Sequence, residues 1–308
     1  MARLVASDPV FRKDNRPFKN TLRKAAHELR LTGWSDGRET SFHPIGYSQR
    51  IPLSCLFESG AEEPMEKVRP QFVLFGDSIT QQSFRPGGWG AALADTYSRK
   101  ADVIVRGYGG YNTRWALFLL NHLFSLSCTA PPAAVTIFFG ANDAALLGRT
   151  SERQYVPLEE YKENLRKIVK HLKECSAMIL VVLITPPPVD EQGRKEYARS
   201  VYGEKAMELP ERTNDNTGAY ARQCVELAKE LHIPCIDLWS KMQETTGWQK
   251  KFLSDGLHLT EEGNAVVHEE VVQVLTDGHL RAEAMPYDFP HHSEIDSDHP
   301  EKAFEPKS

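Results

Sequence analysis

A serine stands directly after a run of strand-forming residues in the stretch FVLFGDSITQQSF, which covers residues 72–84. A serine hydroxyl is a weak nucleophile near neutral pH, so its chemistry requires a base that removes its proton and a third group that orients the base. It also requires hydrogen-bond donors for the oxyanion that forms on the attacked carbonyl. Ser78 is therefore a candidate nucleophile if other parts of the chain supply these groups.

The stretch LSDGLHLT (residues 253–260) supplies a candidate base. Asp255 and His258 are three residues apart, so one turn of the chain can bring the carboxylate to the imidazole. The carboxylate would then fix the ring tautomer and leave the second ring nitrogen for Ser78. By itself this pair is a weak signal, because a lone histidine before a helix is usually a surface or capping residue.

Two further stretches offer candidate oxyanion donors. In FFGANDAAL (residues 138–146), the side-chain amide of Asn142 can donate to a ligand, although the same residue also suits an Asx turn. In RGYGGYNTR (residues 106–114), the glycines allow close approach of a backbone N–H, and Gly110 is the expected donor. A plain loop that needs positive φ explains those glycines equally well. The backbone N–H of Ser78 is the expected third donor.

Apolar runs between these stretches predict the elements that position them. Such continuous runs are typical of strands covered on both faces, and they occupy residues 71–75, 102–107, 134–139, 178–184 and 235–238. Amphipathic helical patterns occupy residues 158–174, 218–232 and about 261–275. This alternation predicts a parallel sheet with helices on both faces. Ligand sites in such sheets lie beyond the carboxyl ends of the strands, which Ser78, Gly110 and Asn142 follow.

The composition excludes several classes of protein. The chain of 308 residues is long enough to bury a core without disulfides, and 41% of it is hydrophobic. No apolar run approaches the roughly 18 residues of a membrane span, and the start lacks a secretory apolar segment. A net charge of −5 argues against nucleic acid as a partner. The chain also lacks G-x-S-x-G, G-x-G-x-x-G and the P-loop pattern.

The cysteines and the two ends of the chain bear on localisation. Five widely spaced cysteines without a C-x-x-C pair indicate neither a zinc site nor a disulfide framework, and they favour reduced thiols in a cytoplasmic protein. Residues 1–50 carry ten Lys and Arg against five Asp and Glu, whereas residues 277–308 carry three against eight. The basic start also fits an organellar import segment, although its acidic residues count against one.

Taken together, the blocks FGDSIT, GGYNTRW, FFGAND and LSDGLH resemble the four sequence blocks of the SGNH (GDSL-type) hydrolases. GDSITQQSFRPGGWGAALAD and LPERTNDNTGAYARQC resemble the isoamyl acetate-hydrolysing esterase branch, and the second stretch is especially similar to its plant members. The resemblance spans about residues 70–275. It implies Ser78 as nucleophile, Asp255 and His258 as the rest of the triad, and Ser78, Gly110 and Asn142 as the oxyanion hole.

The resemblance also implies a fold and an activity. The implied fold is a flavodoxin-like three-layer α/β/α sandwich with a five-stranded parallel sheet, without metal or cofactor. We expect a loosely ordered extension over residues 1–69, the hydrolase domain over 70–276 and an acidic tail over 277–308. The expected activity is hydrolysis of small, short-chain carboxylic esters, acetyl esters among them. An acyltransferase that uses the same triad and a non-catalytic binding module stay open, and so does the oligomeric state.

Two features near the site carry further expectations. A carboxylate that faced the developing oxyanion would oppose it, so we expect Asp77 to turn away and bond backbone or loop groups. Residues 184–216 form a long connection, and such loops are uncommon unless they cover a site or bind something. We expect a cap that borders the acyl pocket, with a surface insertion as the alternative. Residues 83–90 and 112–114 are expected to shape the pocket.

Overall fold

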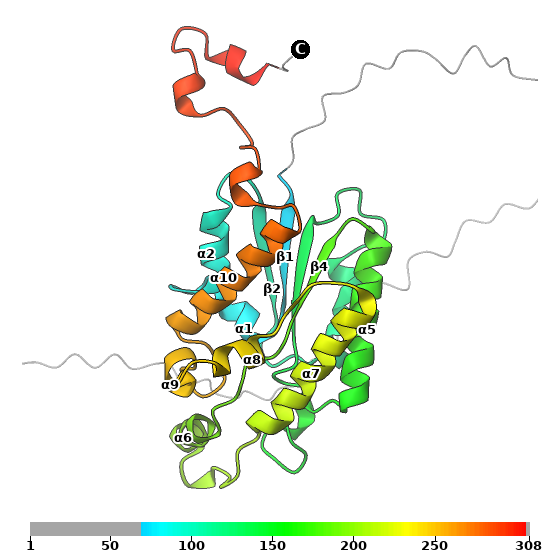
Figure 1. Ribbon diagram of the computed structural model, residues 1–308, viewed down its shortest axis with the longest axis vertical. Helices are drawn as coiled ribbons and strands as arrows, with labels where there is room; N and C mark the ends of the chain where they lie inside the picture. Colours follow the sequence, from blue (N-terminus) through cyan, green and yellow to red (C-terminus); the bar gives the residue numbers. More distant parts are fainter. Residues whose placement is uncertain (1–68, 306–308) are drawn as a thin grey trace, which may run out of the picture. The chain divides into compact units, whose positions relative to one another are not determined.

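The computed structural model describes residues 69–305, in which helices alternate with the strands of one central sheet (Figure 1). The expectations for the first 68 residues, a loosely ordered extension or an import segment, lie outside the described residues. Within the described part of the chain, no helix is both long enough and apolar enough to cross a lipid bilayer.

All five predicted strands are present and form one parallel sheet. Their apolar runs are continuous because helices cover both faces of the sheet. The fifth strand is shorter than predicted and keeps only two residues. In chain order the strands are β1 (Gln71–Gly76), β2 (Asp102–Gly107), β3 (Ala134–Phe138), β4 (Leu180–Ile184) and β5 (Cys235–Ile236).

The strand order β2-β1-β3-β4-β5 decides where the site lies. The chain runs from β1 outward to β2 and then returns across β1 to β3, so the connections leave the two sides of β1 in opposite directions. Such a reversal opens a crevice at the carboxyl ends of the strands, where ligands bind in open α/β sheets. Ser78 follows β1 directly and therefore lies at this crevice, as the sequence predicts.

The long helices begin and end close to the predicted positions. α7 begins four residues earlier than predicted, because the Thr213 hydroxyl accepts a hydrogen bond from the N–H of Asn216 and caps the helix there. α10 begins after Thr260, whose hydroxyl accepts from the N–H of Gly263. The helices are α1 (Ser78–Gln81), α2 (Trp89–Thr96), α3 (Thr113–Ala116), α4 (Leu120–Leu123), α5 (Leu158–Cys175), α6 (Glu191–Tyr202), α7 (Asn214–Leu231), α8 (Leu238–Gln243), α9 (Trp248–Phe252) and α10 (Glu261–Asp277).

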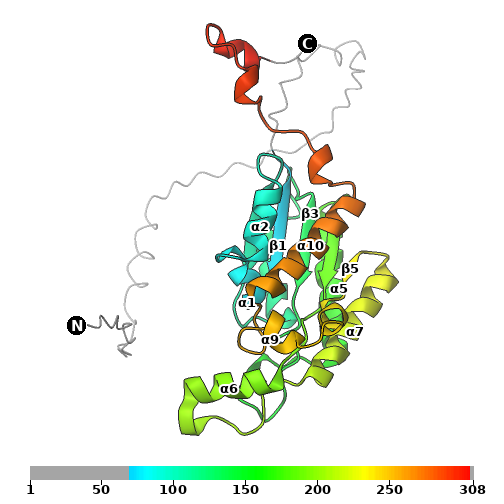
Figure 2. The ribbon, with the colours of Figure 1, turned by 60° about the vertical axis from the view of Figure 1, so that its left-hand side comes forward.

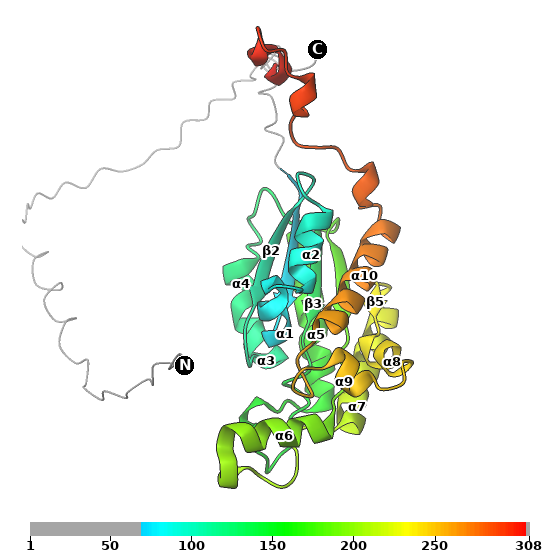
Figure 3. The same cartoon turned by 90° about the vertical axis from the view of Figure 1, so that its left-hand side faces the viewer.

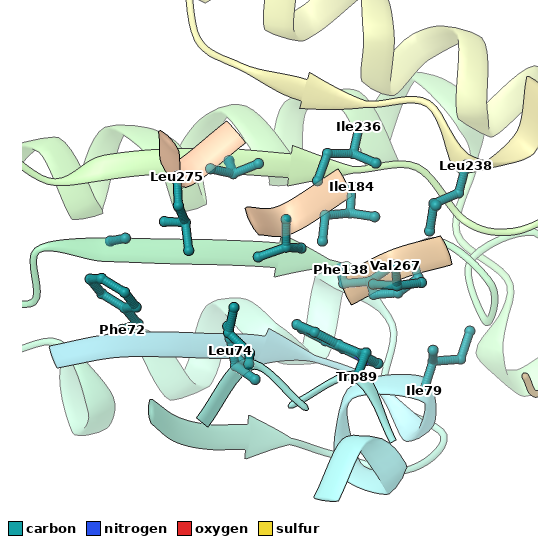
Figure 4. Packing of buried hydrophobic residues seen from close by; sticks show 14 of the residues in the cluster. Phe72, Leu74, Ile79, Trp89, Phe138, Ile184, Ile236, Leu238, Val267 and Leu275 are labelled. Atoms are coloured by element: carbon teal, nitrogen blue, oxygen red, sulfur yellow. The ribbon is translucent and has the colours of Figure 1, made fainter. Parts of the chain in front are cut away.

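Two hydrophobic clusters, one on each face of the sheet, join the layers. On one face α2 and α10 contribute Trp89 and Val267, which are fully buried near Phe138 of β3 (Figure 4). On the opposite face α5 and α7 contribute side chains such as Leu165 and Leu227. Figure 1 shows these two pairs of helices on opposite sides of the sheet. The predicted three-layer sandwich is confirmed, and Trp89 is a packing residue.

The connection after β4 contains a helix that the sequence analysis did not predict. This helix, α6, is followed by a short 3₁₀ turn, η5 (Gly203–Lys205). Figures 2 and 3 show α6 at the same end of the sheet as α1 and α9. This is the end where β1 finishes and where α1 begins at Ser78. The connection therefore lies at the end of the sheet that carries the site residues.

The chain after α10 packs at first against the turn that follows α2. The Tyr97 hydroxyl donates to the carbonyl oxygen of Leu280 at 2.8 Å, and Arg99 Nε lies 3.2 Å from Asp288 Oδ1. The N–H of Asp288 also donates to the carbonyl of Arg99. The first part of the segment expected to be an acidic tail is thus anchored to the body of the sheet domain. Three short 3₁₀ helices lie along it, η6 (Ala282–Ala284), η7 (His292–Glu294) and η8 (Pro300–Phe304).

Candidate active site

The candidate nucleophile lies on the first turn of α1, where β1 ends. Asp77 caps this helix, because its Oδ1 accepts a hydrogen bond from the N–H of Ile79 at 2.9 Å. Gly76 leaves no room for a side chain, since a Cβ there would lie 2.1 Å from Thr80 Oγ1. The tight strand-to-helix turn leaves Ser78 half-buried while Asp77 is fully buried. As expected, the Asp77 carboxylate bonds a backbone group.

Ser78, His258 and Asp255 form one hydrogen-bonded line, although 180 positions separate the serine from the histidine. Ser78 Oγ lies 2.9 Å from His258 Nε2, and His258 Nδ1 lies 2.8 Å from Asp255 Oδ2. In such a geometry Nε2 can take the hydroxyl proton while the carboxylate holds the Nδ1–H. The structure therefore brings these three predicted residues together.

The loop that carries Asp255 is held by its own backbone. Asp255 Oδ1 accepts hydrogen bonds from the N–H groups of Leu257 at 3.0 Å and His258 at 2.8 Å. Gly256, which lies between Asp255 and Leu257, has a φ of +82°, a left-handed backbone conformation that residues other than glycine rarely adopt. Because Oδ1 is occupied by these two donors, Oδ2 is the oxygen that meets the imidazole.

The Asp255 carboxylate is charged in the folded protein. Burial alone would raise its pKa, but the hydrogen bonds from His258 and the charge of Arg194 outweigh burial and hold the pKa well below its usual range. A charged carboxylate beside Nδ1 stabilises the imidazolium that forms when the ring takes a proton. The acid therefore supports the base electrostatically as well as by orientation.

The two remaining predicted site residues lie on neighbouring loops. Gly110 follows β2 with a φ of +78°, and Asn142 follows β3. Asn142 Nδ2 donates to the carbonyl of Tyr111 at 2.9 Å, which joins the two loops. The N–H of Gly109 donates to the side chain of Gln81 at 2.6 Å, which joins the glycine loop to α1. The three loops with predicted oxyanion donors are thus linked to one another.

Two buried carboxylates lie close to these loops. Burial raises the pKa of Asp77 to about 6 and that of Asp143 to about 7, although their hydrogen bonds favour the charged form. Asp143 accepts from the N–H of Thr113 at 3.0 Å. Asp77 Oδ2 is 3.5 Å from Asn142 Nδ2, at the limit of a hydrogen bond. Of the two N–H groups of the Asn142 amide, the one that faces Asp77 is therefore only weakly hydrogen-bonded.

Three charged residues of the connection after β4 contact the site, and the sequence analysis gave none of them a role. Arg194 Nη1 lies 3.1 Å from Asp255 Oδ2, and Arg212 Nη2 donates to Asn142 Oδ1 at 3.0 Å. Glu211 Oε1 lies between them and accepts from Arg194 at 2.6 Å and from Arg212 at 3.0 Å. The alternative of a mere surface insertion is therefore wrong. For Glu211 and Arg212 the signal in the sequence was the resemblance of LPERTNDNTGAYARQC to plant members of the esterase branch, a stretch that does not include Arg194.

A pocket of about 180 Å³ opens beside His258. The loop at residues 83–90 lines one side of it, as predicted. Asn112 and Arg114 were expected to shape a pocket but do not line this one. Instead, Asn112 caps α3, and Arg114 forms an ion pair with Glu160.

The family model described as GDSL-like Lipase/Acylhydrolase matches residues 72–271. The chain belongs to this family. Since the family consists of esterases and lipases, the chain is a carboxylic ester hydrolase of the GDSL type. The resemblance on which the sequence analysis relied is confirmed, and so is the α/β fold that it implied.

Two relatives and one solved structure locate the chain within the family. A GDSL esterase/lipase of Arabidopsis thaliana is 69% identical over 238 residues, which cover 77% of this chain and 98% of the relative. The isoamyl acetate-hydrolyzing esterase 1 homolog of Bos taurus is 42% identical over 236 residues, covering 76% and 91%. The crystal structure of the lipase/acylhydrolase from Enterococcus faecalis matches with a TM-score of 0.53 and 25% identity, covering 71% of this chain and 98% of that one.

Proposed function

We propose that this GDSL-type hydrolase cleaves small carboxylic esters through an acyl-enzyme on Ser78. The observation that carries the proposal is the hydrogen-bonded line from Ser78 Oγ to His258 Nε2 at 2.9 Å and from His258 Nδ1 to Asp255 Oδ2 at 2.8 Å. A serine needs a base in contact with its hydroxyl and a third group that orients the base, and this line supplies both.

In the first half of the reaction, Ser78 Oγ attacks the ester carbonyl carbon while His258 Nε2 takes the hydroxyl proton. The carbonyl π electrons move to the oxygen, and the proposed donors to this oxyanion are the backbone N–H groups of Ser78 and Gly110 and the side-chain amide of Asn142. His258 then gives its proton to the leaving alcohol oxygen as the carbon–oxygen bond breaks.

In the second half, a water molecule attacks the acyl group and gives a proton to His258, which returns it to Ser78 as the acid leaves. The substrate, one water molecule and the side chains of the protein account for every atom and proton. The acyltransferase alternative differs only in the acceptor, because an alcohol replaces water in this half. The ratio of new ester to free acid in the presence of excess alcohol measures how far the enzyme follows that route.

A fluorophosphonate probe tests the nucleophile. We expect stoichiometric labelling of the unmodified protein and of Ser240→Ala, a control at an exposed serine on α8, but no labelling of Ser78→Ala. Full labelling of Ser78→Ala would rule out the proposed nucleophile. A panel of p-nitrophenyl esters from acetate to decanoate then defines the acyl length, for which we expect a short-chain preference. Complete inertness toward the panel would instead favour a non-catalytic binding module.

A further inference from the structure

The pocket beside His258 is lined by the proposed general acid but not by Ser78 itself. A general acid must come within hydrogen-bond reach of the oxygen that it protonates, so the leaving alcohol has to lie next to His258 Nε2. His258 lines the pocket, whereas neither Gly110 nor Asn142 is among its lining residues. The pocket is therefore placed to receive the alcohol part of an ester rather than its carbonyl oxygen.

The side chains around this pocket offer both hydrogen-bond donors and acceptors. Arg85 Nη1 donates to Gln82 Oε1 at 3.1 Å, which leaves the other guanidinium N–H groups and the Gln82 amide nitrogen available. The Glu261 carboxylate, on the first turn of α10, is exposed at the pocket. Among the residues that the structure describes, it accepts no hydrogen bond and forms no ion pair. The apolar part of the lining includes Ile79 and Leu259.

We propose that this pocket binds the alcohol part of the substrate and favours a small polyhydroxy alcohol, such as glycerol or one sugar unit, over an alkyl alcohol. The inference rests on the proposed function. Hydroxyl groups can accept from Arg85 and Gln82 and donate to Glu261, whereas an alkyl chain leaves these groups unused. The volume of about 180 Å³ is below the roughly 300–1,000 Å³ of pockets for drug-sized ligands, so it suits one small unit.

Two esters of the same acid test this inference. Glycerol monoacetate and n-propyl acetate give the same acetyl-enzyme, so a difference in kcat/KM between them arises while the alcohol is still bound. Each kcat/KM is divided by the rate constant of alkaline hydrolysis of that ester, which removes the difference in intrinsic reactivity. We expect the corrected value to be about tenfold higher for glycerol monoacetate, as one hydrogen bond to a charged group would give.

Substitutions at the pocket should remove that preference. Arg85→Met and Glu261→Gln are each expected to lower the ratio several-fold, because kcat/KM falls more for glycerol monoacetate than for propyl acetate. Arg222→Met, at an exposed arginine on α7, is the matched control and should leave the ratio unchanged. A ratio near one in the unmodified enzyme, or a ratio that both variants leave intact, overturns the pocket proposal while both esters are still hydrolysed. Hydrolysis of neither ester, without labelling of Ser78, overturns the proposed function itself.

A second inference rests on an independent set of contacts, the charged bridge formed by Arg194, Glu211 and Arg212. The three side chains are only 8%, 8% and 3% exposed, so they are held within the protein. One end of the bridge contacts Asp255 and the other contacts Asn142. The bridge therefore spans from the proposed acid to a proposed oxyanion donor.

The Arg212 end determines which way the Asn142 amide faces. A guanidinium offers only donors, so the amide oxygen must be the atom that lies against Arg212 Nη2, and Nδ2 is directed to the other side. Arg212 Nη2 also donates to Gln154 Oε1 at 2.6 Å, and Gln154 Nε2 donates to the carbonyl of Gly110 at 3.1 Å. One arginine thus fixes a proposed side-chain donor and, through Gln154, the loop of a proposed backbone donor.

The geometry points to Arg212 as a positioning residue that acts through Asn142. Like the pocket, this assignment rests on the proposed function. A role through Asn142 predicts that removal of the Arg212 contact matters only while Asn142 is present. A double-mutant cycle measures that dependence, because a merely structural role would reduce activity equally in both backgrounds.

The cycle uses Arg212→Lys, which keeps the buried charge but loses the fork that reaches Asn142. We expect kcat for p-nitrophenyl acetate to fall about tenfold with KM nearly unchanged, and less than twofold in the Asn142→Ala background. Arg166→Lys, at a surface ion pair on α5, is the control. Equal losses in both backgrounds, or no loss in either, overturn the assignment. If Arg212→Lys does not fold, Arg212→Gln takes its place in the same cycle, and equal losses in the two backgrounds again overturn the assignment.

Discussion

Asp255→Asn tests whether the acid controls the tautomer of His258. The amide oxygen of the new side chain can face either the backbone or the imidazole. If it faces the backbone, it keeps the bonds from the N–H groups of Leu257 and His258, and the amide nitrogen is set against Nδ1. An N–H that points at Nδ1 forces the ring proton onto Nε2, and a protonated Nε2 cannot take the proton of Ser78.

The hydrogen bonds of the two orientations decide the outcome. The backbone-facing oxygen keeps two backbone bonds and gains one from the amide to Nδ1, while the nitrogen meets the donor group of Arg194. The opposite orientation keeps the bond from Nδ1 and the 3.1 Å contact with Arg194, but it sets the nitrogen against two backbone donors. The inactive arrangement is favoured by about one bond, or about 1 kcal/mol. The loss of the carboxylate charge adds to this, and a triad acid replaced by its amide lowers kcat by about 10⁴-fold.

The assay measures kcat for p-nitrophenyl acetate together with the urea unfolding midpoint. We expect kcat to fall by about 10⁴-fold while the protein stays folded, because the side chain keeps its shape and its backbone bonds. Asp237→Asn is the matched control, since Asp237 caps α8 and makes no contact with the triad. A folded Asp255→Asn enzyme with less than a tenfold loss would refute the role of the acid.

Three further predictions concern the oxyanion loop, a buried acid and the core. Asn142→Ala should lose about 10²–10³-fold in kcat and stay folded, and normal turnover would contradict its role as a donor. Burial raises the pKa of Asp143 from 3.8 to about 7, so the folded state binds the extra proton and the free energy of unfolding should fall as pH rises from about 4 to about 7. Asp143→Asn should flatten that slope in urea titrations, and an unchanged slope would count against it. Trp89→Ala should lower the free energy of unfolding by about 3–5 kcal/mol, and a loss below 1 kcal/mol would contradict its place in the core.

The sheet was predictable because its strands are covered on both faces. Each strand can be recognised from its own continuous apolar run, without knowledge of the segments that pack against it. Parallel strands bring their carboxyl ends to one edge of the sheet. The meeting of Ser78 with His258 follows from that rule combined with the family resemblance. The resemblance was needed, because the spacing of Asp255 and His258 alone does not indicate which strand end their loop approaches.

The helix α6 was not predictable from periodicity, because its buried face is not apolar. Its buried residues are Gly193 and Arg194, whereas its large apolar side chains, Tyr197, Val201 and Tyr202, are exposed. The helix forms because the Asp190 side chain accepts from the N–H of Gln192 and caps it, and because Arg194 finds acidic partners in Glu211 and Asp255. Those partners are 17 and 61 residues away, and only the folded loops bring them together.

Two glycines explain how an arginine on α6 reaches the acid. A Cβ on Gly256 would lie 2.6 Å from the backbone nitrogen of Arg194, and a Cβ on Gly193 would lie 3.0 Å from the Cα of Gly256. The first turn of α6 therefore packs directly against the loop that carries Asp255. A larger side chain at position 193 or position 256 would prevent this packing.

The Asp255 carboxylate, which α6 covers, explains why the bridge of Arg194, Glu211 and Arg212 contains these charges. A buried charge without a partner destabilises a protein by several kcal/mol, so covering Asp255 requires a cation, which Arg194 supplies. A second buried cation, Arg212, orients the Asn142 amide, and Glu211 balances it. Burial alone would raise the pKa of Glu211, but the two arginines hold it below its usual value, so the carboxylate stays charged. Two carboxylates and two guanidinium groups thus form a neutral cluster, which allows a charged triad acid to be covered by a polar helix.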